Sequence, residues 1–238
     1  MELAEHVVQK SMSPKMFDSS CMACVGLPFM DLPFFSVIVC TYNRASLLSR
    51  ALDSLISQRY KNWEAVIVDD GSTDTTSSVV QRYVAMDHRF VSLYQTNSGT
   101  GAARNTGITR SRGQYVTFLD SDDAYAPDHL SIRYDLLQQA PMTDLLHGGV
   151  HIIGSPWVRD KDDPSRFVHL DDCVIGGTFV IKRDVFSRLG MFDAVRYADD
   201  TMFFDRAMQH GVTIEKTTEP TYIYHRDTPD SLCSTYAP

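Results

Sequence analysis

The apolar residues of the first half of the chain follow two alternating patterns. Short, uninterrupted runs rich in β-branched residues, such as FSVIVC (35–40) and EAVIVDD (64–70), are typical of strands that are buried on both faces. The stretch ASLLSRALDSLISQRY (45–60) instead places its apolar residues at helical spacing, which predicts an amphipathic helix. This alternation predicts an α/β fold with a mostly parallel central sheet flanked by helices.

The alternation continues to residue 120 and is less regular afterwards. Up to that point we expect further strands over 90–95 and 114–120 and further helices over 73–86 and 101–111. Beyond it we expect helices over 127–140 and 199–211 and strands over 144–153, 173–181, 212–217 and 221–226. No linker-like break separates the two halves. Residues 34–238 are therefore predicted to form a single domain, preceded by a partly ordered N-terminal extension over residues 1–33.

Composition and charge exclude some classes of partner. The chain has 238 residues, 43% of them hydrophobic and 22% charged, as in an ordinary globular protein. The formal net charge of -8 and the lack of a basic stripe argue against nucleic acid as the main partner. No stretch approaches the roughly 20 apolar residues of a membrane-spanning helix, and no secretory signal is apparent. We therefore expect a cytoplasmic protein, for which peripheral contact with a membrane stays open.

The five cysteines do not predict a metal or redox site. Cys21 and Cys24 have CxxC spacing, but no second CxxC or close histidine pair completes a zinc site. The surrounding sequence also lacks the strand followed by a helix that a redox motif normally has. Reduced thiols are the simpler interpretation.

Polar turns follow four of the expected strands. They are TYNR (41–44), DDGSTD (69–74), NSGTGAARN (97–105) and DSDD (120–123). In parallel sheets, ligands bind outside the carboxyl ends of the strands, so these turns predict a composite site. The carboxylates of the last turn would repel one another unless a positive group or a metal ion lies among them.

These turns also carry a resemblance to a known family. SVIVCTYNR, VIVDDGSTD, GTGAARNTGI and GQYVTFLDSDD have the order and spacing seen in family 2 glycosyltransferases of the GT-A fold. The later segment GMFDAVRYADDTMFFDRA is similar to the one that holds the acidic catalytic pair of that family. The resemblance implies a metal-dependent, inverting transfer of a sugar from a nucleotide-sugar, by the family pattern a UDP-sugar, to a hydroxyl of a glycan, lipid-linked or small-molecule acceptor. Residues 34–125 would then bind the donor, and residues 126–238 the acceptor.

The resemblance implies that Mn²⁺ or Mg²⁺ holds the donor diphosphate. Such hard cations prefer oxygen ligands and take few of them from protein. By the family pattern, Asp122 ligates the metal, Asp120 reaches toward the ribose, and Asp123 could assist through water. His225 matches a family position near the metal or the diphosphate. The alternative interpretations are a solvated acidic turn and a surface histidine.

The family pattern also places residues beside the uracil ring of the donor. These are Tyr42 and Asp70, flanked by Thr41 and Arg44. An aromatic ring suits the flat face of uracil, and a carboxylate can accept from its imide N–H. The alternatives are a half-buried aromatic residue at a strand end for Tyr42 and a turn former before glycine for Asp70.

Arg104 lies near the start of an expected helix, where the helix dipole favours negative rather than positive charge. A bound phosphate or a carboxylate would explain its position, and a salt bridge to Asp69 or Asp122 is compatible with either. Gly99 and Gly101 are expected to permit close approach of the backbone.

The transfer step needs a base that deprotonates the acceptor hydroxyl. Asp199 and Asp200 begin an expected helix, whose N-terminal field favours their ionised forms. The family usually has Glu-Asp here, with the second acid as the base. The resemblance therefore assigns the base to Asp200 and acceptor binding to Asp199, with plain N-capping as the alternative. Trp157, in a polar stretch that we interpret as a mobile lid, could stack on a sugar or pack in the core.

Two other functions remain open at this point. A nucleotidyltransferase of related architecture would predict a glycine- and lysine-rich first loop, which TYNRASL lacks. A non-catalytic relative that binds a sugar or nucleotide would be indicated by the loss of Asp122 or Asp200, and both are present. The sequence does not predict the donor sugar, the acceptor or the oligomeric state.

Overall fold

The computed structural model describes residues 32–160, 163, 165–195 and 198–227. The chain separates into two compact units, residues 1–31 and 32–238, and every described residue belongs to the second unit. The predicted N-terminal extension, except for its last two residues, therefore lies outside the described residues. So does the CxxC pair of Cys21 and Cys24.

The elements of the described part alternate between strand and helix up to β4. They are β1 (Phe35–Thr41), α1 (Leu48–Ile56), β2 (Trp63–Asp69), α2 (Thr76–Met86), β3 (Phe90–Tyr94), α3 (Thr100–Arg110) and β4 (Tyr115–Phe118). The later elements are β5 (Ala124–Tyr125), α4 (His129–Gln139), β6 (Leu145–Ile153), β7 (Trp157–Arg159), β8 (Phe167–His169), the 3₁₀ turns η1 (Leu170–Asp172) and η2 (Gly176–Thr178), β9 (Val180–Lys182), α5 (Arg183–Leu189), α6 (Asp199–Gln209) and β10 (Ile214–His225).

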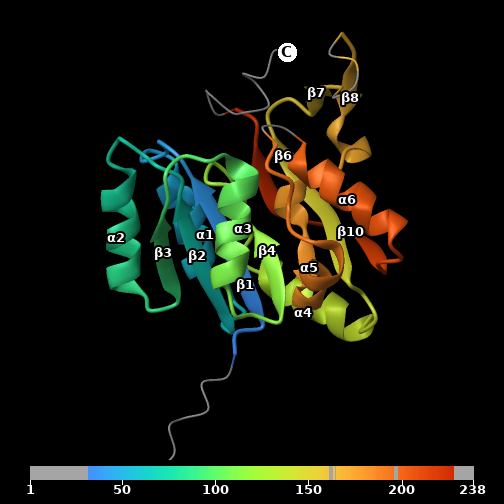
Figure 1. Ribbon diagram of the computed structural model, residues 1–238, viewed down its shortest axis with the longest axis horizontal. Helices are drawn as coiled ribbons and strands as arrows, with labels where there is room; N and C mark the ends of the chain where they lie inside the picture. The colour runs from blue at the N-terminus through green and yellow to red at the C-terminus, as the bar shows by residue number, and fades with distance from the viewer. Residues whose placement is uncertain (1–31, 161–162, 164, 196–197, 228–238) are drawn as a thin grey trace, which may run out of the picture. The chain divides into compact units, whose positions relative to one another are not determined.

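Eight strands form one sheet in the order β3-β2-β1-β4-β9-β6-β10-β5 (Figure 1). The first four strands in that order are parallel. Strand β9 is antiparallel to both of its neighbours, β10 is parallel to β6, and β5 is antiparallel to β10. Six of the eight strands therefore run in one direction, which confirms the predicted mostly parallel α/β sheet.

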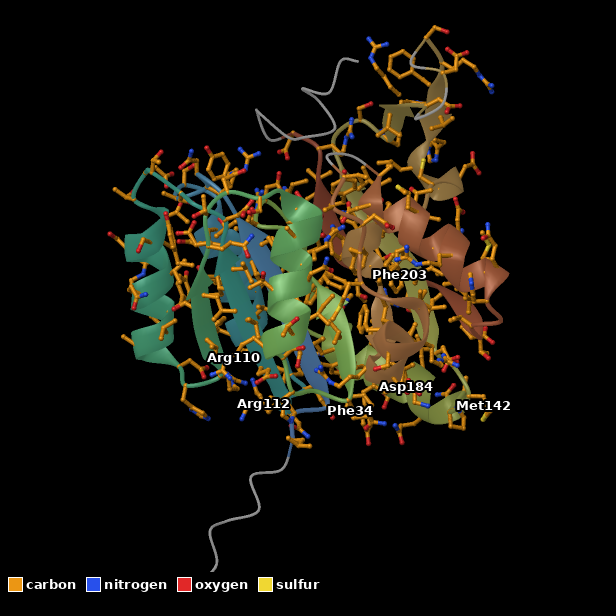
Figure 2. The ribbon with its side chains drawn as sticks, viewed as in Figure 1. Phe34, Arg110, Arg112, Met142, Asp184 and Phe203 are labelled. Carbon is orange, nitrogen blue, oxygen red and sulfur yellow. The ribbon has the colours of Figure 1, made fainter. Side chains whose placement is uncertain are left out.

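Side chains of β1 alternate between two apolar cores, one on each face of the sheet. Phe35, Val37 and Val39 pack in the core that also holds residues of α1, α2 and α4. Ile38 packs in the second core, to which α3, α5 and α6 contribute. Phe203 of α6 is one of its fully buried members (Figure 2). Because successive side chains of a strand point to opposite faces, a strand covered on both sides needs the continuous apolar run seen in the sequence.

The last strand differs from the prediction. Residues 212–217 and 221–226 were expected to form two short strands, but a single strand, β10, covers most of both ranges. It pairs with β6 over residues 214–217 and 222–225, with a shift of register between Thr217 and Tyr222. The polar residues in the middle of β10 occupy this irregularity, which is why the sequence pattern looks interrupted there.

The expected strand over residues 173–181 is wrong over most of its length. A 3₁₀ turn, η2, occupies its centre, and only β9 at its end is extended. The glycines Gly176 and Gly177 have no side chains to pack in a strand, and they allow the close contacts described below. Helix α5 directly follows β9 and was not predicted.

The polar stretch interpreted as a lid contains strand β7, which pairs with β8 as an antiparallel hairpin. Trp157 lies on this hairpin opposite His169 and is 52% exposed. The alternative that Trp157 packs in the core is therefore wrong. Within the residues that the structure describes, no helix has both the length and the apolar character needed to cross a bilayer.

Candidate active site

The turns after β1, β2 and β4 adjoin because β1 lies between the other two strands. Thr41 at the end of β1 is in register with Asp69 at the end of β2. Beyond the strands, the N–H of Asp70 still donates to the carbonyl oxygen of Thr41, at 2.9 Å. The composite site predicted from the four polar turns is thus built on neighbouring strand ends.

Asn43 joins the first two turns and was not among the predicted site residues. Its Oδ1 accepts the N–H of Thr73 at 2.8 Å, and its own N–H donates to Ser72 Oγ at 2.9 Å. Its φ of 51° lies in the left-handed region, which asparagine adopts more readily than most residues. The presence of an asparagine within a polar turn was the sequence feature from which this role could have been predicted. The neighbouring Arg44 donates through its N–H to Thr76 Oγ1, at 3.0 Å.

Asp70 is buried, and its carboxylate holds the turn before α3. One oxygen accepts from Gln95 Nε2 at 2.7 Å and from the N–H of Ser98 at 2.9 Å, and the other accepts from the N–H of Gly99 at 2.9 Å. Asp70 therefore positions this turn, whatever it binds in addition. The predicted contact with a uracil base stays a prediction.

Thr41 and Tyr42 have opposite environments. The Thr41 side chain is buried, and its Oγ1 has no hydrogen-bond partner among the described residues. Tyr42 is 47% exposed, so it is accessible to a ligand.

Arg104 connects two parts of the site that are 95 residues apart in sequence. Its Nη1 donates to Asp199 Oδ2 at 2.7 Å, and its Nη2 lies 3.7 Å from Asp120 Oδ1. Burial alone lowers the pKa of Arg104, but Asp199, Asp120 and Asp200 together raise it, so the guanidinium stays charged. The expected carboxylate partner is confirmed, but it is neither Asp69 nor Asp122.

The guanidinium of Arg104 lies among aromatic rings. Its Cζ is 5.5 Å from the ring centroids of both Phe118 and Phe192. Gly101, one turn earlier on α3, packs so closely against the chain before α6 that a Cβ would lie 2.3 Å from the carbonyl oxygen of Asp193. The close approach predicted for Gly101 is confirmed. At Gly99 it is wrong, because a Cβ there would meet nothing within 4 Å and the residue instead has a φ of +88°.

The three acids after β4 have different surroundings. Asp123 is fully buried and accepts from the Tyr222 hydroxyl at 2.7 Å and from the N–H of His225 at 2.8 Å. Both oxygens of Asp123 are therefore occupied, which leaves little room for the water-mediated role toward a metal. Asp122 is partly exposed, and no hydrogen bond of its carboxylate is found among the described residues.

Asp120 lies at the centre of the negative charge, with 39% of its side chain exposed. Burial raises its pKa, Arg104 lowers it, and Asp122, Asp200 and Asp199 raise it again, with a net result of about 6. For Asp199 and Asp123 as well, burial is the main cause of a raised pKa. The site therefore holds more negative charge than its single buried guanidinium offsets.

Arg50 of α1 reaches the same region and was not predicted. One of its Nη atoms donates to the carbonyl oxygen of Asp122, and the other lies 3.2 Å from Nδ1 of His225. The same His225 nitrogen is 3.3 Å from Asp227 Oδ1. His225, with 14% of its side chain exposed, is therefore part of this network and not a surface histidine. Nothing in the sequence of α1 distinguishes Arg50 from an ordinary helix-surface cation.

The Asp200 carboxylate is fixed by contacts with η2 and with the first turn of α6, to which Asp200 belongs. Its Oδ2 accepts the N–H of Gly176 at 2.9 Å, and its Oδ1 accepts the N–H of Thr201 at 2.7 Å. A Cβ on Gly176 would lie 2.6 Å from the Cβ of Asp200, so glycine is required for this contact. Ala198, not an aspartate, occupies the N-cap position of α6, and the Asp199 carboxylate binds Arg104. Plain N-capping therefore does not explain the acidic pair.

The metal-ligating side chains available near the turn after β4 suit a divalent cation that takes few ligands from protein. Among the described residues, no group of three or more His, Cys, Asp or Glu side chains could hold a metal ion by itself. Mg²⁺ and Mn²⁺ need no such group when phosphate and water complete their coordination. Among the described residues, the Asp122 carboxylate has no hydrogen bond, and Nε2 of His225 can bind such an ion when the Nδ1–H of the ring donates to Asp227.

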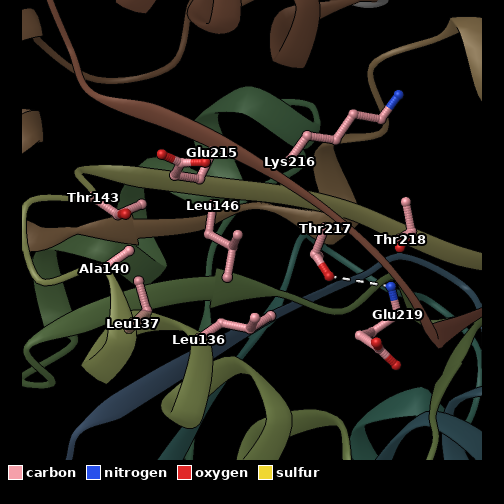
Figure 3. A pocket seen from close by; sticks show the side chains of 10 residues that line it. All are labelled: Leu136, Leu137, Ala140, Thr143, Leu146, Glu215, Lys216, Thr217, Thr218 and Glu219. Carbon is pink, nitrogen blue, oxygen red and sulfur yellow. Dashed lines mark hydrogen bonds between the residues drawn. The ribbon is translucent and has the colours of Figure 1, made fainter.

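A pocket of about 270 Å³ lies apart from these acids, between α4 and β10 (Figure 3). It is lined by Leu136, Leu137, Ala140, Thr143, Leu146, Glu215, Lys216, Thr217, Thr218 and Glu219. None of these residues belongs to the four polar turns or to the acidic pair. The chemistry of the site is therefore not located in this pocket.

Comparison with known proteins identifies a family and a fold. The model of the family described as glycosyl transferase family 2 matches residues 36–190, which is more than half of the chain. Glycosyltransferase GlyA of Streptococcus pneumoniae serotype 4 is 46% identical over 99 residues, which cover 42% of this chain.

Two solved structures are similar in fold. S. aureus TarS 1-349 in complex with UDP-GlcNAc has a TM-score of 0.71 and 24% identity over 85% of this chain. The mannosyltransferase PcManGT of Pyrobaculum calidifontis, in complex with GDP-Man and Mn²⁺, has a TM-score of 0.65 and 24% identity over 86% of this chain. The chain covers 14% of the length of GlyA, 61% of the TarS chain and 59% of the PcManGT chain, which is less than two thirds in each case.

Proposed function

Because the chain belongs to glycosyl transferase family 2, we propose that it transfers a sugar from a nucleotide-sugar donor to a hydroxyl group of an acceptor, with inversion at the anomeric carbon. The observation that supports this most directly is the contact of Arg104 with both Asp120 and Asp199. It joins the strand end proposed to bind the donor to the helix start proposed to carry the base.

The proposed donor is a UDP-sugar. The exposed ring of Tyr42 and the buried carboxylate of Asp70 lie on the adjoining turns after β1 and β2, where Thr41 and Arg44 flank them. TarS is similar in fold and has been solved with UDP-GlcNAc, which agrees with this choice. PcManGT has been solved with GDP-Man, so a GDP-sugar is the competing donor.

We propose that Asp122 and His225 hold a divalent cation, Mn²⁺ or Mg²⁺. When bound, such an ion neutralises the diphosphate of the donor as it becomes the leaving group. Asp120 lies toward the ribose of the donor in this proposal. Asp123 acts indirectly, because its carboxylate fixes the N–H of His225 and the hydroxyl of Tyr222. PcManGT, solved with Mn²⁺, supports the choice of metal by analogy.

Asp200 is the proposed base. Its carboxylate takes the proton of the acceptor hydroxyl while the hydroxyl oxygen forms a bond to the anomeric carbon. The bond from that carbon to the donor phosphate breaks on the opposite side, and the nucleoside diphosphate leaves with the bonding electrons. The N–H groups of Gly176 and Thr201 hold the Asp200 carboxylate in place for this step.

The acceptor belongs to one of three classes: a glycan, a lipid-linked sugar or a small molecule. We propose that residues 126–238, which contain η2 and α6, bind it, and that residues 34–125 bind the donor. We place the protein in the cytoplasm, with peripheral membrane contact if the acceptor is lipid-linked. Nucleic acid is not a proposed partner, because the formal net charge is -8.

Release of the nucleoside diphosphate from UDP-GlcNAc and from GDP-mannose, measured in the presence of Mn²⁺, tests the proposal. We expect release from one of the two donors, and we expect Asp122→Asn and Asp200→Asn each to reduce its rate by about 10²-fold or more. Asp128→Asn at the start of α4 and Asp205→Asn on the exposed face of α6 are the matched controls, with expected rates close to that of the unchanged protein. The Asp200 variant should still bind the nucleotide.

The two alternatives predict other results in the same assay. A nucleotidyltransferase would form pyrophosphate from a nucleoside triphosphate and a sugar phosphate, and would release no UDP or GDP. A non-catalytic relative would bind a nucleotide sugar without cleaving it, and Asp200→Asn would then change nothing that can be measured.

A further inference from the structure

We propose that Asp199 acts on the donor side of the site, as a positioning residue that fixes Arg104 and through it Asp120, and not as a contact to the acceptor. The inference rests on the proposed function, since it assigns roles within the same site. It departs from the assignment implied by the family resemblance, in which Asp199 binds or orients the acceptor.

The direction and burial of the Asp199 side chain support this assignment. Asp199 is 7% exposed, and its Oδ2 lies 2.7 Å from Nη1 of Arg104. A carboxylate committed to a buried guanidinium has little surface left for an acceptor sugar. The adjacent Asp200 points instead to η2, where Gly176 donates to it, so the two acids of the pair face different partners.

Arg104 has no other carboxylate partner at salt-bridge distance among the described residues than Asp199 and Asp120. The contact with Asp120 is the longer of the two, at 3.7 Å. Asp199 therefore fixes the guanidinium, and the guanidinium in turn limits where the more exposed Asp120 carboxylate can lie. Arg104 lies beside the rings of Phe118 and Phe192 and is only 6% exposed, and this low exposure strengthens its ion pairs.

Removing the charge of Asp199 has a predictable effect on this chain of contacts. An uncharged asparagine leaves a buried guanidinium with a weaker partner, and Arg104 then shifts toward Asp120 to recover an ion pair. Asp120 would be drawn away from the position in which it meets the ribose. The result is weaker binding of the nucleotide, although Asp199 itself does not touch it.

The test is the affinity for UDP in the presence of Mn²⁺, measured by isothermal titration calorimetry and so without any acceptor. GDP replaces UDP if the unchanged protein prefers it. We expect Asp199→Asn to weaken binding by about tenfold, the loss expected for one charge-assisted hydrogen bond. Asp199→Glu should restore the affinity to within about threefold, because it supplies the same charge to Arg104. Arg104→Lys should weaken binding as Asp199→Asn does, because a single ammonium cannot span both carboxylates.

The matched control is Asp193→Asn. Asp193 lies in the segment before α6 and also pairs with an arginine, Arg206, at 2.8 Å, but this pair is more exposed. We expect no change in UDP affinity for this variant. Thermal unfolding of each variant shows whether it is folded, and the comparison of Asp199→Asn with Asp199→Glu separates loss of charge from loss of packing.

Unchanged UDP affinity in a folded Asp199→Asn protein would overturn the inference, and so would failure of Asp199→Glu to restore binding. Kinetics of donor hydrolysis give a second criterion: we expect Asp199→Asn to raise the KM for the donor and to keep most of kcat, in contrast to Asp200→Asn. If the unchanged protein bound neither UDP nor GDP, the proposed function itself would fail, which is a different result from the two above.

Discussion

The hydroxyl of Tyr222 donates a hydrogen bond of 2.7 Å to the carboxylate of Asp123, and both side chains are fully buried. Tyr222 lies on β10 and Asp123 follows β4, so this bond joins the end of the last strand to the turn that carries the proposed metal ligand. The Tyr222 side chain therefore supports this turn, although the two residues are 99 positions apart in the sequence.

We expect Tyr222→Phe to lower the free energy of unfolding by about 1–3 kcal/mol, because it leaves a buried carboxyl group with one partner fewer. Urea denaturation measures this loss. Tyr94→Phe serves as the control, since Tyr94 is 70% exposed and should tolerate the change with little effect. Equal stability of the two variants would mean that the bond to Asp123 contributes nothing to the fold.

The carboxyl groups of the site should make the metal-free protein less stable as the pH rises from about 4 to about 6, whereas His129 and His147, whose pKa is lowered by burial, act in the opposite direction over this range. Burial raises the pKa of Asp120, Asp123 and Asp199, and that of Asp120 reaches about 6 from an ordinary value of 3.8. In this range these carboxyl groups keep protons in the folded protein that they have lost in the unfolded chain, so their contribution to stability decreases as the pH rises. Asp120 is 39% exposed, so we expect it to account for about 1 kcal/mol and not the full linkage value.

Urea denaturation at several pH values isolates the carboxyl contribution when the unchanged protein, Asp120→Asn and Asp128→Asn are compared, because the two histidines are common to all three. Between about pH 4 and about pH 6 we expect the stability of Asp120→Asn to fall less, or to rise more, than that of the unchanged protein, and we expect Asp128→Asn to match the unchanged protein. An identical pH dependence in Asp120→Asn and in the unchanged protein would contradict the raised pKa of Asp120. At neutral pH we expect added Mn²⁺ to raise the thermal unfolding temperature, because a cation replaces the lost protons.

Asp70→Asn should destabilise the turn before α3. An amide has only one oxygen, whereas the Asp70 carboxylate accepts three hydrogen bonds on two oxygens. At least one partly buried donor is then left facing an NH₂ group, at an expected cost of about 1 kcal/mol in the free energy of unfolding. Asp135→Asn on the exposed side of α4 is the control. If Asp70→Asn weakened UDP binding and left the stability unchanged, the residue would be a ligand contact alone.

The first half of the fold could be predicted well because its strands are buried on both faces. The apolar runs around Val37, Ile67 and Val116 allow few other interpretations, and the helices between them show clear spacing. The sequence could not predict that β9 enters the sheet between β4 and β6, because this order depends on contacts between distant segments. It also misled over Gly176 and Gly177, whose apolar neighbours suggested a strand where a 3₁₀ turn forms.

The residues of the candidate site could be recognised singly, but not their partners. Asp199 and Arg104 were both selected, yet their contact joins segments far apart in the chain, and the salt-bridge partners expected for Arg104 were Asp69 or Asp122 instead. Arg50 gave no signal because a cation on an exposed helix face is common, and only the folded structure brings it to His225. Local pattern identifies which residues carry chemistry, and tertiary structure decides which of them meet.

The excess of carboxylates around Arg104 has a consequence for the order in which ligands arrive. A free nucleoside diphosphate is itself an anion, and Asp120, Asp122, Asp199 and Asp200 together repel it. We expect the cation to enter before the nucleotide or together with it, and the nucleotide to leave before the cation or with it. The cation and the nucleotide would then bind in a fixed order, which is imposed by the negative charge of the carboxylates in the absence of ligands.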